Sequence, residues 1–235
     1  MTAICLFGAE GRMGEAIRAL TAVTDAGPQL EHLAAGSVLI DFSSPEGAVL
    51  AAKACAEHGV PLVTGTTGLS DREQKTIAEA AERIPVVQSG NMSLGITLLR
   101  RLVAEAAEVL EGFDIEILET HHRHKKDSPS GTALLLGEAA ARARGSALSE
   151  AARFTRHGRD AERRSGEIGF AVRRGGGVFG EHEVAFMSEG ETVTLGHQAL
   201  GRESFARGAL AAAHWVEGRR PGLYGMDHVL GFVPA

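Results

Sequence analysis

The amino-acid sequence predicts an α/β protein in which a doubly wound parallel sheet is accompanied by an α+β domain with a mixed sheet. In the N-terminal part, short apolar runs alternate with helical patterns, which is typical of parallel strands covered by helices on both faces. The runs expected to form strands lie at 3–7, 38–42, 61–64 and 85–88. The expected helices lie at 15–20, 46–58 and 70–83, the last opened by a capping-box spacing between Ser70 and Glu73.

A different pattern begins after residue 92. A long helix is expected at 94–110, then a strand at 114–120 and a helix at 131–144. Strand patterns separated by glycine turns follow, which favours a mixed or antiparallel sheet with helices on one face. These strands are expected at 166–173, 180–187 and 191–197. The charged connection 144–165 is expected to be a mobile or intersubunit loop. A helix at 204–217 and a closing segment at 223–233 end the chain.

Three glycines at the end of the first strand indicate a dinucleotide-binding turn. Gly8, Gly11 and Gly14 form a G-x-x-G-x-x-G pattern directly between a strand and a helix. In Rossmann-like domains such glycines make a tight turn, let the backbone approach a pyrophosphate and let the helix pack closely. The other loops at the carboxyl ends of the predicted strands are small and polar, which suits a cofactor lying close to the backbone. They are 43–45, 65–68 and 89–92.

The interval between residues 21 and 37 is short for a second strand and its helix. We expect a strand over 22–25 and a short helix over 29–35, or else a domain in which the second strand is missing. Asp25 is the carboxylate placed where a ribose ligand would belong. It is equally well placed as a turn residue before Gly27-Pro28.

The most informative stretch is a basic loop between a strand and a helix. Six consecutive residues, 121–126, are three histidines, one arginine and two lysines, and a helix is expected to begin at Ser130 or Gly131. Free backbone N–H groups at a helix start bind carboxylates or phosphates. Together these features predict an anion site with proton donors beside it, although a solvated basic loop has the same composition.

Composition limits the partners. The net charge of -6 disfavours general nucleic-acid binding, so the basic loop is expected to bind a small molecule. No apolar run is long enough to span a bilayer, the N-terminus lacks a signal-peptide pattern, and two cysteines make no disulfide framework. We therefore expect a cytoplasmic protein. We expect no metal at the histidines, because Arg123, Lys125 and Lys126 would repel a cation.

With these motifs in view, the chain resembles the 4-hydroxy-tetrahydrodipicolinate reductases (dihydrodipicolinate reductases) of bacterial lysine and diaminopimelate biosynthesis. Residues 119–133, ETHHRHKKDSPSGTA, are similar to the long signature of that family and match its H-H-x-x-K-x-D-x-P-S-G-T-A part at every fixed position from His121, with the glutamate at Glu119. The motifs at 8–14, 39–43, 65–68 and 91–95 also stand where the family has them. The short 21–37 interval is the departure, because members usually carry there a longer helix, a full second strand and the residue that holds the ribose.

The resemblance implies an organisation and a set of site residues. A dinucleotide domain, 1–92, would be closed by 203–235, and an inserted domain, 93–202, would carry the substrate site and build a homotetramer. His121 resembles the proton donor and Lys125 the second catalytic cation. The residues resembling the substrate-binding set are His122, Ser130, Gly131, Thr132 and Arg202. Those resembling the loops for NADH or NADPH are Gly8, Ala9, Glu10, Gly11, Arg12, Met13, Gly65, Thr66, Thr67, Ser89, Gly90, Asn91 and Met92.

The implied reaction is hydride reduction of a six-membered cyclic imine that carries two carboxylates. His121 has suitable acidity to supply the accompanying proton near neutral pH, while Lys125 stabilises charge. Two alternatives stay open at this stage. One is another nicotinamide-dependent imine or keto-acid reductase, and the other is a dicarboxylate-binding protein that has lost its cofactor.

Overall fold

The structure, a computed structural model, describes residues 2–159 and 161–234. The chain divides into two compact units, which are described separately. Unit 1 runs up to Leu94 and resumes at Arg202, and unit 2 is Gly95–Gly201. The functions expected of the two parts, cofactor binding and substrate binding, remain predictions. No helix in the described ranges is both long and apolar enough to cross a membrane.

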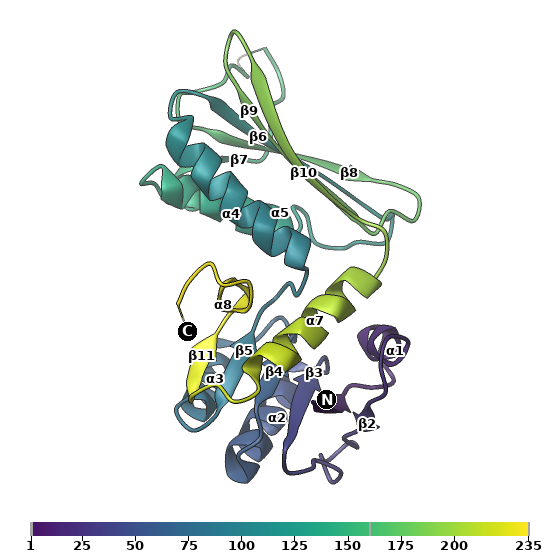
Figure 1. Cartoon of the computed structure of the whole chain (residues 1–235). Helices are drawn as coiled ribbons and strands as arrows, with labels where there is room; N and C mark the ends of the chain where they lie inside the picture. The colour runs from purple at the N-terminus through teal and green to yellow at the C-terminus, as the bar shows by residue number, and fades with distance from the viewer. Residues whose placement is uncertain (1, 160, 235) are drawn as a thin grey trace. The chain divides into compact units, whose positions relative to one another are not determined.

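Unit 1 contains a parallel sheet. Among the described residues, six strands lie in the order β11-β5-β4-β3-β1-β2, and every neighbouring pair is parallel (Figure 1). The strands are β1 (Ala3–Phe7), β2 (Thr24–Asp25), β3 (Ser37–Asp41), β4 (Leu62–Thr64), β5 (Pro85–Gln88) and β11 (Gly222–Tyr224). The helices are α1 (Arg12–Arg18), α2 (Pro45–His58), α3 (Asp71–Ala81), α7 (Glu203–Val216) and α8 (Met226–Val229). The predicted Rossmann-like α/β architecture is confirmed.

Alternate strand residues enter two different cores, as a sheet covered on both faces requires. Leu39, in β3, packs with α2 and α3, whereas its neighbour Ile40 packs with α1 and α7. Local chemistry fixes the helix ends. Ser44 caps α2 by accepting from the Gly47 N–H, and the predicted capping box of Ser70 and Glu73 opens α3.

The 21–37 interval differs in part from the prediction. A second strand is present, since β2 pairs in parallel with β1 at Thr24 and Asp25, so the alternative of a missing strand is wrong. The helix expected over 29–35 is also wrong, because this fully described stretch forms successive turns. The side chain of Asp25 accepts a hydrogen bond of 3.0 Å from the Gly27 N–H, and Gly27 has a positive φ. A side-chain turn therefore takes the place of a helix.

Unit 2 is a mixed sheet with helices on one face. Its five strands, counted over the described residues, have the order β10-β9-β6-β8-β7 (Figure 1). They are β6 (Asp114–His121), β7 (Ala152–Arg153), β8 (Ile168–Arg174), β9 (Gly180–Met187) and β10 (Thr192–Ala199). Helices α4 (Leu94–Val109) and α5 (Gly131–Ala143) share one core with the sheet, around Ile117, Leu136 and Phe186.

The charged connection 144–165 is more ordered than predicted. It contains a short helix, α6 (Leu148–Ala151), followed directly by β7, which pairs in parallel with β8. Arg163 anchors its far end through an ion pair of 2.8 Å with Asp114 and a contact with Glu116. The connection therefore carries secondary structure over 148–153, where β7 pairs with β8, and its expected mobile or intersubunit character stays a prediction.

Helix α7 is integral to unit 1 because it touches the loop after β5. A Cβ at Gly208 would lie far inside van der Waals contact with the carbonyl oxygen of Met92. We expect Gly208→Ala to lower the free energy of unfolding by at least about 3 kcal/mol, since neither backbone can yield. Urea unfolding measures this. Gly112→Ala is the control, because its Cβ would meet open space, and equal losses in both variants would contradict the assignment.

Candidate active site

The predicted strand, basic loop and helix start are all present in unit 2. Strand β6 ends at His121, the loop follows, and α5 begins at Gly131. Ser130 is the N-cap of α5, and its hydroxyl accepts a hydrogen bond of 3.1 Å from the Ala133 N–H. Chain direction and cap chemistry thus bring the last residue of a strand close to the first turn of a helix.

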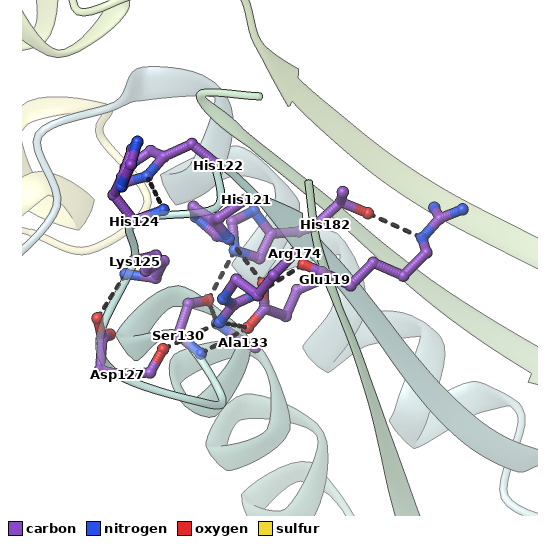
Figure 2. A network of polar contacts seen from close by, with 12 residues as sticks. Glu119, His121, His122, His124, Lys125, Asp127, Ser130, Ala133, Arg174 and His182 are labelled. Atoms are coloured by element: carbon purple, nitrogen blue, oxygen red, sulfur yellow. Dashed lines mark hydrogen bonds and ion pairs between the residues drawn. The ribbon is translucent and has the colours of Figure 1, made fainter. Parts of the chain in front are cut away.

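A buried carboxylate, Glu119, joins these pieces. Arg174 Nη1 and Nη2 each lie 2.7 Å from one oxygen of Glu119, and the Ser130 N–H donates to Oε1 at 2.9 Å. His121 Nδ1 lies 2.6 Å from Oε2. Figure 2 shows these side chains converging, with Glu119 between Arg174 and His121. The carboxylate is 1% exposed, so its charge is compensated by Arg174 and not by water.

The surroundings of His121 move its pKa in opposing directions. Burial is the largest effect and lowers the pKa below the ordinary 6.5, and the bond to Glu119 opposes it. Positive charge on Lys125 and Arg174 lowers the pKa further. The pKa of Glu119 is also low, because the bonds from Arg174, His121 and Ser130 outweigh its burial. At neutral pH the histidine is therefore mostly neutral and the glutamate is ionised.

A second buried histidine lies beside the first. His182, in β9, is 6% exposed, and its ring centroid lies 5.1 Å from that of His121 in an edge-to-face arrangement (Figure 2). Its Nε2 lies 2.9 Å from the Ser130 hydroxyl, and its buried Nδ1 has no hydrogen-bond partner among the residues that the structure describes. Burial lowers the pKa of His182 to about 4. Sequence reasoning missed His182, although its place in an otherwise apolar alternation, Gly180 to Phe186, was a usable signal.

The other predicted residues of this unit lie around the loop. Lys125 Nζ lies 2.9 Å from Asp127, and this contact lowers the pKa of that carboxyl. His122 accepts at Nδ1 from the His124 N–H, so its ring is turned back on the loop. Ser130 is 2% exposed, and its hydroxyl caps α5 and contacts His182, while its predicted contact with the substrate stays a prediction. Gly131 and Thr132 form the first turn of α5.

A cavity of about 470 Å³ lies in unit 1 at the carboxyl ends of β1, β3 and β4. Six of the residues predicted to bind the cofactor line it: Gly11, Arg12, Met13, Gly65, Thr66 and Thr67. Phe42, Ser43 and Arg202 line it as well. Arg202, predicted with the substrate set, therefore belongs to the unit that carries the glycine turn.

Asp41, which sequence reasoning passed over, organises this cavity. It is fully buried at the end of β3. Its Oδ2 accepts from the hydroxyls of Thr64 at 2.7 Å and Thr66 at 2.8 Å, and its Oδ1 accepts from the Ser43 N–H at 3.0 Å. The loops after β3 and β4 are therefore tied to one carboxylate, and the Thr66 hydroxyl is occupied.

The remaining cofactor candidates have structural surroundings. The side chains of Ala9 and Met92 are buried in the core of unit 1, so only their backbones could face a ligand. Glu10 is exposed and paired with Arg18. Ser89 donates to the carbonyl of Asn91, which shapes the loop with Gly90. Among the described residues, no group of histidine, cysteine, aspartate or glutamate side chains is arranged to hold a metal ion.

Comparison with known proteins identifies the family. The family described as dihydrodipicolinate reductase matches through its C-terminus over residues 95–230 and through its N-terminus over residues 19–92. The chain belongs to this family. The 4-hydroxy-tetrahydrodipicolinate reductase of Caulobacter vibrioides is 47% identical, over 97% of this chain and 97% of that protein. The enzyme of the same name from Thiobacillus denitrificans is 51% identical over 93% of this chain and 82% of its own length.

Solved structures agree on the fold. Dipicolinate-bound dihydrodipicolinate reductase from Paenisporosarcina sp. TG-14 superposes with a TM-score of 0.78 at 23% identity, covering 97% of this chain and 99% of that one. An amine dehydrogenase from Mycobacterium smegmatis gives 0.61 at 12% identity, over 96% and 95% of the two chains. The chain is an NAD(P)H-dependent oxidoreductase of the dihydrodipicolinate reductase family.

The glycine turn fits the nicotinamide cofactor that the family uses. Gly8 has a φ of +80°, and a Cβ there would lie 2.6 Å from the carbonyl oxygen of Phe42. Only glycine allows this turn, which leaves the backbone of Gly11 and Arg12 at the mouth of the cavity. These residues, with Gly65 to Thr67, would hold the dinucleotide in unit 1.

The buried His182 makes stability depend on pH. Because its folded pKa of about 4 lies below the ordinary 6.5, stability is complete above pH 6.5 and is lost as the pH falls toward 4. Between pH 7 and pH 5 this group alone costs about 2 kcal/mol. Glutamine at this position can still reach Ser130. Between pH 7 and pH 5 we therefore expect the free energy of unfolding of His182→Gln, measured with urea, to fall by about 2 kcal/mol less than that of the parent. Exposed His214→Gln is the control, and parallel curves for His182→Gln and the parent would contradict the expectation.

Proposed function

We propose that this protein catalyses the NAD(P)H-dependent reduction of 4-hydroxy-tetrahydrodipicolinate to tetrahydrodipicolinate, in lysine and diaminopimelate biosynthesis. The observation that carries the proposal is the reductase signature, 119–133, folded as one unit with His121 held against Glu119 at the end of β6. The names of relatives about 50% identical over most of the chain support the same activity. When bound, the cofactor supplies the hydride.

The chain supplies positioning, charge and a proton. We propose His121 as the proton donor, at the site where negative charge develops on the substrate. The pKa of His121 is low in the free protein. The negative charge of a dianionic substrate would raise this pKa on binding, which favours the protonated donor when the substrate is present. Lys125, only 20% exposed, is proposed to stabilise the developing charge.

The substrate carboxylates are proposed to bind at the start of α5. The positive end of the α5 helix dipole, at Gly131 and Thr132, suits a carboxylate, and His122 and Arg123 lie in the adjoining loop. Arg202, which lines the cavity of unit 1, stays a predicted substrate residue. We also propose a cytoplasmic homotetramer built through unit 2, which light scattering of the purified protein would test.

The first prediction for this function concerns the two catalytic side chains. We expect the parent enzyme to oxidise NADH or NADPH in the presence of enzymatically generated substrate. His121→Ala and Lys125→Ala should each lower kcat by about 10²- to 10⁴-fold while the circular dichroism stays unchanged. Lys75→Ala, an exposed lysine of α3, is the matched control. If the parent does not turn over this substrate but does reduce another cyclic imine, the proposed activity is wrong.

Cofactor choice is proposed to depend on Asp25, which ends β2 beside β1. A carboxylate there accepts from both ribose hydroxyls of NADH and repels the 2′-phosphate of NADPH. Its Oδ1 is bonded to the Gly27 N–H, which leaves Oδ2 for a ligand. We expect Asp25→Ala to raise the KM for NADH several-fold and to leave or lower that for NADPH. Glu31→Ala, in the same loop, is the control; unchanged constants in Asp25→Ala would leave it a turn residue only.

A further inference from the structure

The proton attributed to His121 leaves open which ring nitrogen transfers it and what fixes that choice. The described groups facing the ring come from four elements. They are Glu119 on β6, Lys125 on the loop, Arg174 on β8 and His182 on β9. Glu119 is the acceptor among them, and it contacts Nδ1, not Nε2.

We propose, building on the function above, that Glu119 held by Arg174 is a positioning residue that fixes His121 with its proton on Nδ1, so that Nε2 is the atom that takes up and delivers the catalytic proton. An ionised carboxylate can only accept hydrogen bonds, so Nδ1 must carry hydrogen whenever it is bonded to Glu119. Nε2 then holds a lone pair in the neutral ring and a proton in the imidazolium.

The neighbours of Nε2 are consistent with this assignment. No described protein group donates to or accepts from Nε2, and the backbone facing it is Gly180 of β9. A Cβ at Gly180 would lie 2.9 Å from Nε2. A side chain there would press on Nε2, and glycine avoids this contact.

Arg174 gives the carboxylate a fixed orientation and limits its effect. It binds both oxygens of Glu119 and also donates to the Asp127 carbonyl at 2.9 Å. Its charge lies close enough to His121 to oppose the pull of Glu119 on the imidazolium. Glu119 therefore orients the ring while the positive charge of Arg174 keeps the histidine able to release its proton.

A buried ion pair that serves only stability would predict something different. Such pairs contribute little net stability, because desolvation offsets attraction. Stability alone also does not explain why Oε2 of Glu119 contacts the imidazole of His121. The distinguishing properties are the tautomer of His121 and the pH dependence of turnover, which an ion pair that does not act on His121 would leave unchanged.

Glu119→Gln gives a sharp outcome because of the donors around the two oxygens. Oε1 accepts from both the Ser130 N–H and Arg174 Nη2, so the amide oxygen of glutamine should occupy that position. Its NH₂ group then faces Nδ1 of His121 and can donate to it. We expect the neutral ring to change from the Nδ1–H to the Nε2–H tautomer, which long-range ¹H–¹⁵N spectra of histidine-labelled protein distinguish. His121→Gln identifies the resonance.

Activity measurements extend the test. Loss of the carboxylate should lower the pKa of His121, so the fall of kcat/KM with rising pH should move about one to two units toward acid, with kcat reduced by about 10²-fold or more. Arg174→Met should move the same limb toward higher pH. Arg174→Lys, which keeps a charge but not both bonds, should fall between. Glu116→Gln, on the same strand but paired with Arg163 and Arg156, is the matched control and should move neither limb nor tautomer.

The spectra need no substrate, so this proposal and the proposed reaction fail separately. If the parent shows no turnover, the proposed reaction is contradicted, but the tautomer of His121 can still be measured. An unchanged Nδ1–H tautomer in folded Glu119→Gln, or an unshifted limb in both Glu119→Gln and Arg174→Met, would overturn the positioning role.

Discussion

The geometry of unit 2 depends on one buried carboxylate. Glu119 accepts hydrogen bonds from the end of β8 through Arg174, from the start of α5 through the Ser130 N–H, and from the end of its own strand through His121. The ends of β6 and β8 and the start of α5 are thereby held at one point. An unpaired carboxylate in this place would cost several kcal/mol, so the segments must come together when the unit folds.

A buried carboxylate also joins separate loops in unit 1, but there it accepts hydrogen bonds from neutral groups. Asp41 is bonded to the hydroxyls of Thr64 and Thr66 and to the Ser43 N–H. Neutral donors hold this carboxylate, whereas a guanidinium holds Glu119. The two carboxylates therefore differ in role: Asp41 ties two loops of unit 1 together, whereas Arg174 neutralises the carboxylate that contacts His121.

Much of this arrangement could be predicted from the sequence, because turn and cap residues act locally. The glycine turn, the capping box and the start of α5 at Gly131 follow from residues a few positions apart. The second strand and the turn at Asp25 also followed from the sequence. The turns over 29–35, where a helix was expected, did not, since so short a stretch has no pattern that separates a helix from successive turns. Arg174 and His182 were missed for another reason. Their contacts with Glu119 and Ser130 span more than 50 residues, and strand register alone brings them together.

The net charge of the groups around His121 indicates which kind of ligand the loop would bind. Glu119 is balanced by Arg174, and Asp127 by Lys125. With His121 and His182 neutral at pH 7, as their lowered pKa values require, these pairs sum to zero. Arg123 and Lys126, both exposed on the same loop, remain as two positive charges. The proposed dianionic substrate would therefore meet two uncompensated positive charges, and it would bring negative charge close to His121.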